Sequence, residues 1–150
     1  MESFQRNAGR SVFEVEAISN KIFVNLAKLD HVIYKNNLYQ LLFGDSNSFK
    51  PTEHTACRLG KWYDSGLGKT EFGSTKSYAS LNKPHATVHK EANLLAKECS
   101  GNSIVCSKAV IEEKINLIEN ASENVFRVLD QMLEEKNNIV MKIAAQDLFK

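Results

Sequence analysis

The chain has 150 residues, 43% of them hydrophobic, and a formal net charge of +1 at pH 7. This length and composition suit one globular domain with a sizeable core. Acidic and basic residues are mixed along the chain, so no basic block indicates nucleic acid and no acidic tail indicates a basic partner. The sequence has no apolar run of about 18 residues, which a membrane-spanning helix needs. Its first 30 residues lack the apolar core of a signal peptide.

The three cysteines, Cys57, Cys99 and Cys106, stand at irregular spacing. An odd number does not resemble a disulfide framework and favours a reducing cytoplasm. Cys99 and Cys106 flank a predicted turn, where they form either a redox pair or inert thiols that are wholly or partly buried. We expect the inert thiols.

A long first helix is predicted from Phe4 to Leu42, because apolar residues recur there three or four positions apart. The apolar series is Val15, Ile18, Ile22, Leu26, Leu29, Val32 or Ile33, Tyr39 and Leu42. The helix starts without a clear N-cap. We therefore expect that the chain comes from a longer protein in which this helix continues upstream.

Shorter elements are predicted in the middle of the chain. They are a loop over Gly44–Pro51, a short helix over Thr55–Tyr63, an irregular stretch over 66–75 and a short turn over Ser77–Leu81. Pro84 suits the first residue of the next helix, because its missing N–H needs no partner there. That helix is predicted to end at about Cys99, with Gly101 as its stop.

The last helix is predicted from near Ser103 to Leu148. Its apolar residues alternate three and four apart: Ile111, Ile115, Ile118, Val125, Leu129, Met132, Ile139 and Ile143. This heptad-like spacing suits helices that cross at shallow angles. The predicted fold class is all-α, an antiparallel four-helix-type bundle with one or two short extra helices and a bound zinc.

Candidate metal ligands lie on these helices. His85 and His89 are four residues apart and share one helix face, although two ordinary helix histidines would show the same spacing. His31 lies two-thirds of the way along the first helix, and Cys57 lies near the start of a short helix, where the dipole favours a thiolate. Three imidazoles and one thiolate form a full tetrahedral set for Zn²⁺. The fourth histidine, His54, is expected to be a solvated loop residue.

Each ligating imidazole needs an acceptor on its other ring nitrogen. Asp30 and Glu91 are near the candidate ligands in sequence and are the side chains available for this role.

Three separated motifs resemble one known family. The strings His31-x-Ile33, Cys57-x-Leu59-Gly60-x-Trp62 and His85-x₃-His89 are similar, in this order, to the signature of the bacterial chemoreceptor zinc-binding domain. The intervals agree as well, with 25 residues between His31 and Cys57 and 22 between Trp62 and His85. The resemblance extends from about residue 20 to the end of the chain.

The resemblance implies a four-helix bundle with one Zn²⁺, held at His31, Cys57, His85 and His89. It also implies a cytoplasmic homodimer attached to an upstream chemoreceptor signalling domain, and through it to the chemotaxis kinase and coupling protein, or attached to a diguanylate cyclase. Residues 1–19 would then be the end of the signalling helix and residues 20–150 the domain itself. Within the motif, Leu59 and Trp62 can dock the short helix on the bundle, and Gly60 permits a close backbone approach.

Several functions remain open. A zinc-bound thiolate at Cys57 can be oxidised to a sulfenic acid by hypochlorous acid, which would make the domain a redox sensor. The domain can instead sense zinc through occupancy of the site, or serve as a zinc-stapled dimerisation module. Catalysis is not expected, because position 86 is Ala where a zinc protease needs Glu. Four protein ligands also leave no place for a catalytic water.

Overall fold

The computed structural model describes residues 2–44, 48–100 and 106–148. These residues form α1 (Glu2–Phe43), α2 (Arg58–Ser65), α3 (Leu67–Phe72), a 3-10 turn η1 (Tyr78–Ser80), α4 (Asn82–Cys99) and α5 (Lys108–Leu148). The described residues contain helices and no strand, so the prediction of an all-α bundle is confirmed. None of the described helices has the length and apolar character needed to cross a membrane.

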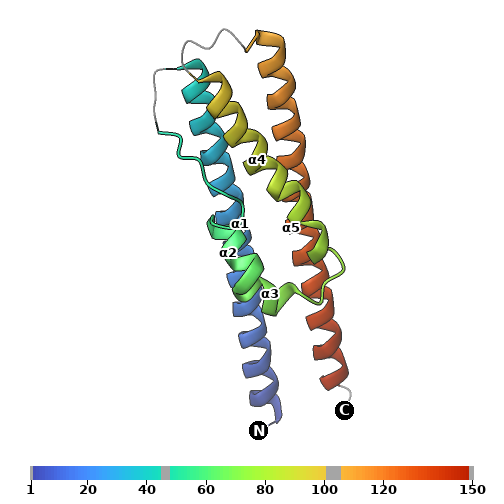
Figure 1. Cartoon of the computed structure of the whole chain (residues 1–150). Helices are drawn as coiled ribbons and strands as arrows, with labels where there is room; N and C mark the ends of the chain where they lie inside the picture. The colour runs from blue at the N-terminus through green and yellow to red at the C-terminus, as the bar shows by residue number, and fades with distance from the viewer. Residues whose placement is uncertain (1, 45–47, 101–105, 149–150) are drawn as a thin grey trace.

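The bundle is built on two long helices, α1 and α5, which lie side by side with the two ends of the chain at the same end of the molecule (Figure 1). Helices α1 and α4 run in one direction, whereas α5 and the short pair α2 and α3 run in the other (Figure 1). This is the up-down-up-down order of an antiparallel four-helix arrangement, with α2 and α3 together taking the second position.

Helix α1 packs on the bundle through a face that the apolar series did not reveal. Its buried residues are Val24, Ala27, His31, Lys35 and Leu38, spaced three and four apart. The predicted series lies on another face, where Val15, Ile18, Ile22 and Leu29 are each more than half exposed. The helix was therefore predicted correctly, but its most regular apolar stripe does not face the core of this chain.

Helix α5 supplies the other wall of the core. The centre of its predicted stripe is buried, at Ile118, Val125, Leu129 and Met132, together with Val88, Ala92 and Leu95 of α4. The end of the stripe, at Ile139 and Ile143, is exposed. Burial of apolar surface between α4 and α5 is thus concentrated in the middle of the molecule.

Polar contacts fix how α1 and α5 align. Lys28 of α1 pairs with Asp130 of α5 at 2.6 Å, and Lys35 pairs with Glu119 at 3.0 Å. Both lysine ammonium groups also lie within 6 Å of the Phe126 ring centroid, at 5.8 and 5.7 Å. A slip of one helix turn along the other would break all of these contacts.

Several boundaries differ from the sequence prediction. Helix α4 begins at Asn82, so Pro84 lies within its first turn and is not its first residue. The short helix begins at Arg58, because Cys57 acts as its N-cap. Residues 67–72, predicted to be irregular, form α3, since burial of Phe72 and packing of Gly68 against Trp62 outweigh the local glycines. The last helix begins at Lys108, and the predicted start at Ser103 and stop at Gly101 lie outside the described residues.

Candidate metal centre

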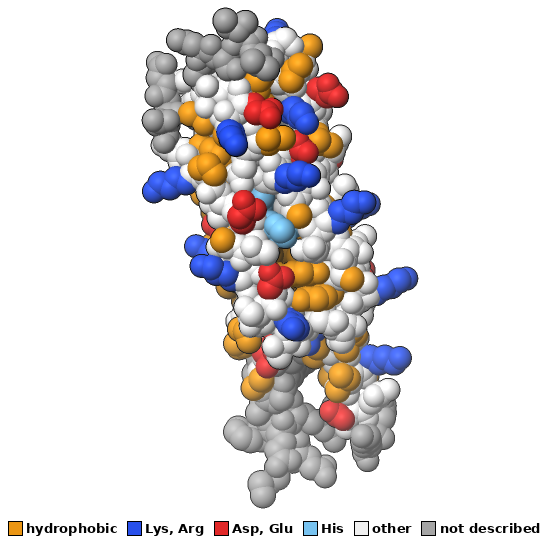
Figure 2. Space-filling model, in the orientation of Figure 1, with side chains coloured by type: hydrophobic (Ala, Val, Ile, Leu, Met, Phe, Trp, Pro, Cys, Tyr) orange, Lys and Arg blue, Asp and Glu red, His pale blue; other side chains and the backbone are white. Residues whose placement is uncertain are grey.

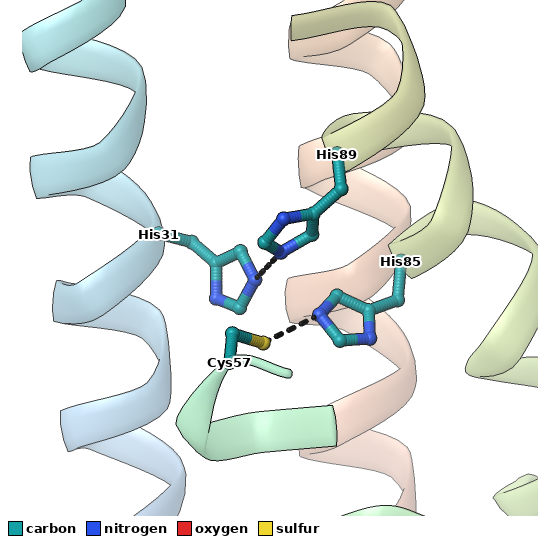
Figure 3. A group of neighbouring side chains, drawn as sticks. All are labelled: His31, Cys57, His85 and His89. Atoms are coloured by element: carbon teal, nitrogen blue, oxygen red, sulfur yellow. Dashed lines mark hydrogen bonds between the residues drawn. The ribbon is translucent and has the colours of Figure 1, made fainter. Parts of the chain in front are cut away.

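Four side chains converge between α1, α4 and the start of α2. They are His31, Cys57, His85 and His89, the same four residues that the sequence motifs indicated, and their ligand atoms all lie within 4.8 Å of one another. Figure 3 shows the three imidazole rings and the thiol pointing toward a common centre. The histidine residues are 1–3% exposed, whereas Cys57 is half-buried.

Helix α4 places two of these residues by simple geometry. His85 and His89 are one turn apart, and both are buried on the face that also carries Val88 and Ala92. Because the apolar residues of this face pack into the core, the histidines are carried into the interior with them.

Cys57 is positioned by the start of α2. Its backbone is extended, with φ −76° and ψ 166°, and its Sγ accepts a hydrogen bond from the Gly60 amide at 3.4 Å. A Cβ at Gly60 would lie 1.8 Å from the His54 carbonyl oxygen, so this close approach requires glycine. Leu59 is buried, and Trp62 stacks on Phe23 of α1 with ring centroids 4.5 Å apart. The docking role expected for Leu59, Gly60 and Trp62 agrees with these contacts.

Backbone carbonyls determine which nitrogen two of the histidines present. Nδ1 of His31 lies 2.8 Å from the Ala27 carbonyl oxygen, and Nδ1 of His89 lies 2.7 Å from that of Thr52. A carbonyl oxygen only accepts, so each Nδ1 carries the hydrogen and each Nε2 carries a lone pair. The two Nε2 atoms are 3.3 Å apart. Two facing lone pairs repel each other, and a cation bound between them would remove that repulsion.

One pair of ligand atoms has the separation that a tetrahedral ion requires. Zn–N bonds of about 2.0–2.1 Å in a tetrahedron separate two nitrogens by about 3.3 Å. The pair His31 Nε2 to His89 Nε2 has this separation, at 3.3 Å, and Cys57 Sγ lies 3.2 Å from His85 Nε2 (Figure 3). Three imidazoles and one thiol therefore form a candidate zinc site in which every coordination position is filled by protein.

Burial keeps the imidazoles neutral in the absence of metal. Removal from water lowers the pKa of His31, lowers that of His85 to about 2 and lowers that of His89 to about 4. Burial also raises the pKa of the Cys57 thiol. Neutral imidazoles are the form that binds metal, so protons compete weakly with a metal ion at the three histidines.

A cavity of about 250 Å³ adjoins the centre and is lined in part by Cys57, His31 and His89. Asp30 and Arg58 also line it and form an ion pair, with Arg58 Nε 3.2 Å from Asp30 Oδ2. On the face shown in Figure 2, histidine surface appears midway along the molecule among side chains of both charges. A small molecule can thus approach the half-buried sulfur through this cavity.

The side chains near the ligands in sequence, Asp30 and Glu91, have other partners. Asp30 pairs with Arg58, and Glu91 pairs with Lys114 at 3.2 Å, while backbone carbonyls serve His31 and His89. Sequence reasoning missed Thr52, whose carbonyl oxygen also accepts from Asn93 at 3.0 Å. A backbone carbonyl carries no side-chain signature, so no pattern in the sequence could have indicated it.

Two other residue predictions need correction. His54 is half-buried instead of solvated, and its ring lies edge-on to that of His85 with centroids 5.6 Å apart. It still stands outside the group of four. Cys99 and Cys106 are joined by a disulfide, so they are not free inert thiols. Their Cα atoms are 5.5 Å apart, within the range that a disulfide spans.

Comparison with known proteins identifies the segment that contains this cluster. Residues 31–96 match the family model of the chemoreceptor zinc-binding domain. The match contains all four clustered residues, so the resemblance is confirmed for this segment and zinc is its cofactor. The matched segment is shorter than the resemblance expected from the sequence, which extended from about residue 20 to the end of the chain. A search of curated proteins and a search of solved structures found no match.

Proposed function

We propose, from the match of residues 31–96 to the chemoreceptor zinc-binding domain, that this chain is a sensory domain in which Cys57 responds to hypochlorous acid. His31, Cys57, His85 and His89 would hold one Zn²⁺. The observation that carries the proposal is the position of Cys57. The Cys57 sulfur lies beside three converging imidazoles, and it is also partly exposed where a cavity adjoins the cluster.

The chemistry at Cys57 follows from its ionisation. Burial raises the pKa of this thiol, and bound zinc would supply the charge that keeps the sulfur a thiolate at neutral pH. The thiolate sulfur attacks the chlorine of hypochlorous acid, the O–Cl bond breaks, and hydroxide leaves. Water then displaces chloride from the sulfenyl chloride and gives a sulfenic acid, so sulfur loses two electrons and chlorine gains two.

Oxidation at this atom would act first on α2. The Cys57 sulfur is both a candidate ligand and the N-cap acceptor for the Gly60 amide, so an added oxygen disturbs two interactions together. The contacts that would still join α2 to α1 include the stacking of Trp62 on Phe23 and the Arg58–Asp30 ion pair. Phe23 lies two turns before His31 on α1, and the change would pass along this helix to a signalling region.

The proposed partners follow from the same family. We propose a cytoplasmic homodimer that acts on an upstream chemoreceptor signalling domain and, through it, on the chemotaxis kinase and coupling protein. Residues 1–19 would belong to the signalling helix and residues 20–150 to the domain. The exposed stripe on α1, with Val15, Ile18 and Ile22 each more than half exposed, supports the dimer. We propose no catalytic activity, because a filled tetrahedron leaves no position for a reacting water.

Two alternatives use the same site. A zinc-responsive regulatory domain of a diguanylate cyclase would respond to occupancy of the four ligands, and the neutral buried imidazoles support reversible loading. A zinc-stapled dimerisation module would use the metal for stability alone.

The deciding experiment exposes the zinc-loaded chain to a sub-stoichiometric dose of hypochlorous acid and traps sulfenic acid for peptide mass spectrometry. Cys57 is expected to be modified, with release of zinc in proportion, whereas Cys99 and Cys106 are joined in a disulfide and offer no thiol for sulfenic acid formation. The Cys57→Ala variant is the control for labelling elsewhere. Modification that leaves Cys57 intact would refute redox sensing. A conformational change on zinc removal would then favour zinc sensing, and its absence would favour the structural module.

A further inference from the structure

A second pair of sulfur atoms lies at the other end of α4. Cys99 is the last residue of α4, and Cys106 stands two residues before α5 begins. A disulfide joins them across a sequence separation of 7, and both residues are half-buried. Cys99 also packs against the hydrophobic core. Both cysteines lie beyond residue 96, outside the segment that matches the zinc-binding family.

We propose that Cys99 and Cys106 form a second redox site, independent of the metal, that exchanges between a dithiol and a disulfide with small-molecule thiols such as glutathione. In the reducing direction, one glutathione thiolate attacks a sulfur of the Cys99–Cys106 bond and forms a mixed disulfide. A second glutathione then displaces the protein thiolate. The products are two protein thiols and one glutathione disulfide, so two electrons pass from glutathione to the protein.

The position of the pair favours this exchange. Attack on a disulfide requires access along the S–S bond, and both cysteines here are partly exposed. The loop that the disulfide closes is short, so the two thiols remain close after reduction and can pair again. The hydrogen bond from the Ser100 amide to the Ala96 carbonyl oxygen holds Cys99 in the last helical turn.

The pair is separated from the metal centre. Cys99 is ten residues after His89 on the same helix, which corresponds to about 15 Å along the axis. Cys57 lies next to His85, one turn further away, with Sγ to Nε2 at 3.2 Å. Direct disulfide exchange between Cys57 and this pair therefore requires large unfolding, so the two sites respond separately.

The oxidation state of the Cys99–Cys106 pair affects the bundle at the C-terminal end of α4. Helix α4 carries His85 and His89, and in the oxidised state its last residue is linked covalently to the segment that enters α5. In the reduced state only packing and hydrogen bonds hold this end. The inference does not rest on oxidation of Cys57, and it holds whether the zinc site senses oxidant, senses zinc or is structural.

The test uses the zinc-loaded chain in buffers that contain reduced and oxidised glutathione at ratios from 1:10 to 1000:1. Free thiols are then alkylated, and the peptides of Cys99 and Cys106 are quantified by mass spectrometry. As the ratio of reduced to oxidised glutathione rises, the alkylated fraction of both peptides is expected to increase together, from near zero to most of the protein. In samples returned to oxidised glutathione before alkylation, this fraction is expected to fall again. Zinc content is expected to remain constant across the series.

Single variants provide the matched control. In Cys99→Ser or Cys106→Ser, the cysteine that remains of the pair is expected to form a mixed disulfide with glutathione. The double variant is expected to form none at either position and to retain zinc. The native chain alone can overturn the proposal. It would do so if Cys99 and Cys106 stayed oxidised at the highest ratio of reduced to oxidised glutathione, or stayed reduced at the lowest. Loss of zinc in step with reduction would overturn the independence of the two sites.

Discussion

Arg58 and Asp30 are joined by an ion pair of 3.2 Å, and each directly adjoins a candidate zinc ligand in the sequence. Asp30 precedes His31 on α1, and Arg58 follows Cys57 at the first position of α2. The Asp30 side chain is 37% exposed and the Arg58 side chain 55% exposed, so the ion pair itself adds little stability. Its effect is positional, because it ties the start of α2 to the helix that carries His31.

Replacing Arg58 by Gln should therefore weaken zinc binding more than it weakens folding. We expect a loss of up to about 10-fold in zinc affinity, since the guanidinium positions Cys57 without touching the metal. The unfolding free energy should change by less than about 1 kcal/mol. A competition titration with a chromophoric chelator measures the affinity. Lys108→Gln is the control, because the Lys108–Glu112 pair is exposed and remote from the centre in sequence. Equal affinities for the two variants would contradict the positional effect.

Removing a candidate ligand should abolish stable zinc retention. The wild-type chain should carry about one Zn²⁺ per protomer after purification, because four protein ligands complete one tetrahedron. His89→Ala and Cys57→Ala should each retain far less zinc by elemental analysis. His54→Ala, in which the altered ring lies beside His85 but outside the group of four, should keep it. Full zinc content in the first two variants would refute the ligand assignment.

A methyl group at position 60 should displace α2. In Gly60→Ala the new Cβ would meet the His54 carbonyl oxygen at 1.8 Å, a contact that only a backbone shift can relieve. We expect a loss of about 1–3 kcal/mol in unfolding free energy together with weaker zinc binding. Chemical denaturation with and without zinc measures both effects. In the control Gly44→Ala, the nearest atoms to the new Cβ are Oε1 and the backbone oxygen of Gln40, at 2.9 and 3.0 Å, so a much smaller shift relieves the contact. A Gly60→Ala chain as stable as that control would show that the approach is not obligatory.

Stability of the zinc-free chain should fall as the pH drops below about 6.5. Burial lowers the pKa of His85 to about 2 and that of His89 to about 4, whereas both take up protons near pH 6.5 when unfolded. The unfolded state then binds more protons, so each histidine removes up to about 1.4 kcal/mol of unfolding free energy per pH unit in this window. Denaturation with chelator at pH 7.5 and pH 5.0 measures the difference. The double variant His85→Gln, His89→Gln should show a flatter profile, and an unchanged slope would exclude these groups.

The exposed stripe of α1 should pair two copies of the chain. Ile18 and Ile22 are 58% and 55% exposed on one helix face, and burial against a second copy would remove this apolar surface from water. Light scattering at tens of micromolar, on the order of usual assay concentrations, should give a dimeric mass for the wild type and a monomeric mass for Ile18→Glu with Ile22→Glu. Thr70→Glu on α3 is the control for an added exposed charge. A monomeric wild type would refute the dimer.

The sequence predicted the helices and the His/Cys cluster better than it predicted which side of α1 faces the core or which groups accept hydrogen bonds from the histidines. Residue type and spacing identify His85 and His89, because a helix brings residues four apart together without further information. The core face of α1 contains Lys35 and His31, so a search for apolar periodicity selects the exposed stripe instead. The disulfide requires the Cα atoms of Cys99 and Cys106 to lie close together, at 5.5 Å, and their spacing in the sequence does not determine this distance.

The segment between α1 and α2 supplies two unlike components of the centre. Cys57 provides the sulfur, and the Thr52 carbonyl oxygen accepts from His89 Nδ1 at 2.7 Å and so fixes its tautomer. If the sulfur is lost from the metal and this segment moves, the carbonyl leaves His89 as well, and the lone pair on Nε2 is no longer guaranteed. Release of one ligand would then weaken a second on the opposite helix. The two ligands are therefore coupled through one segment, and the loss of zinc affinity in a double variant of Cys57 and His89 should be smaller than the sum of the two single losses.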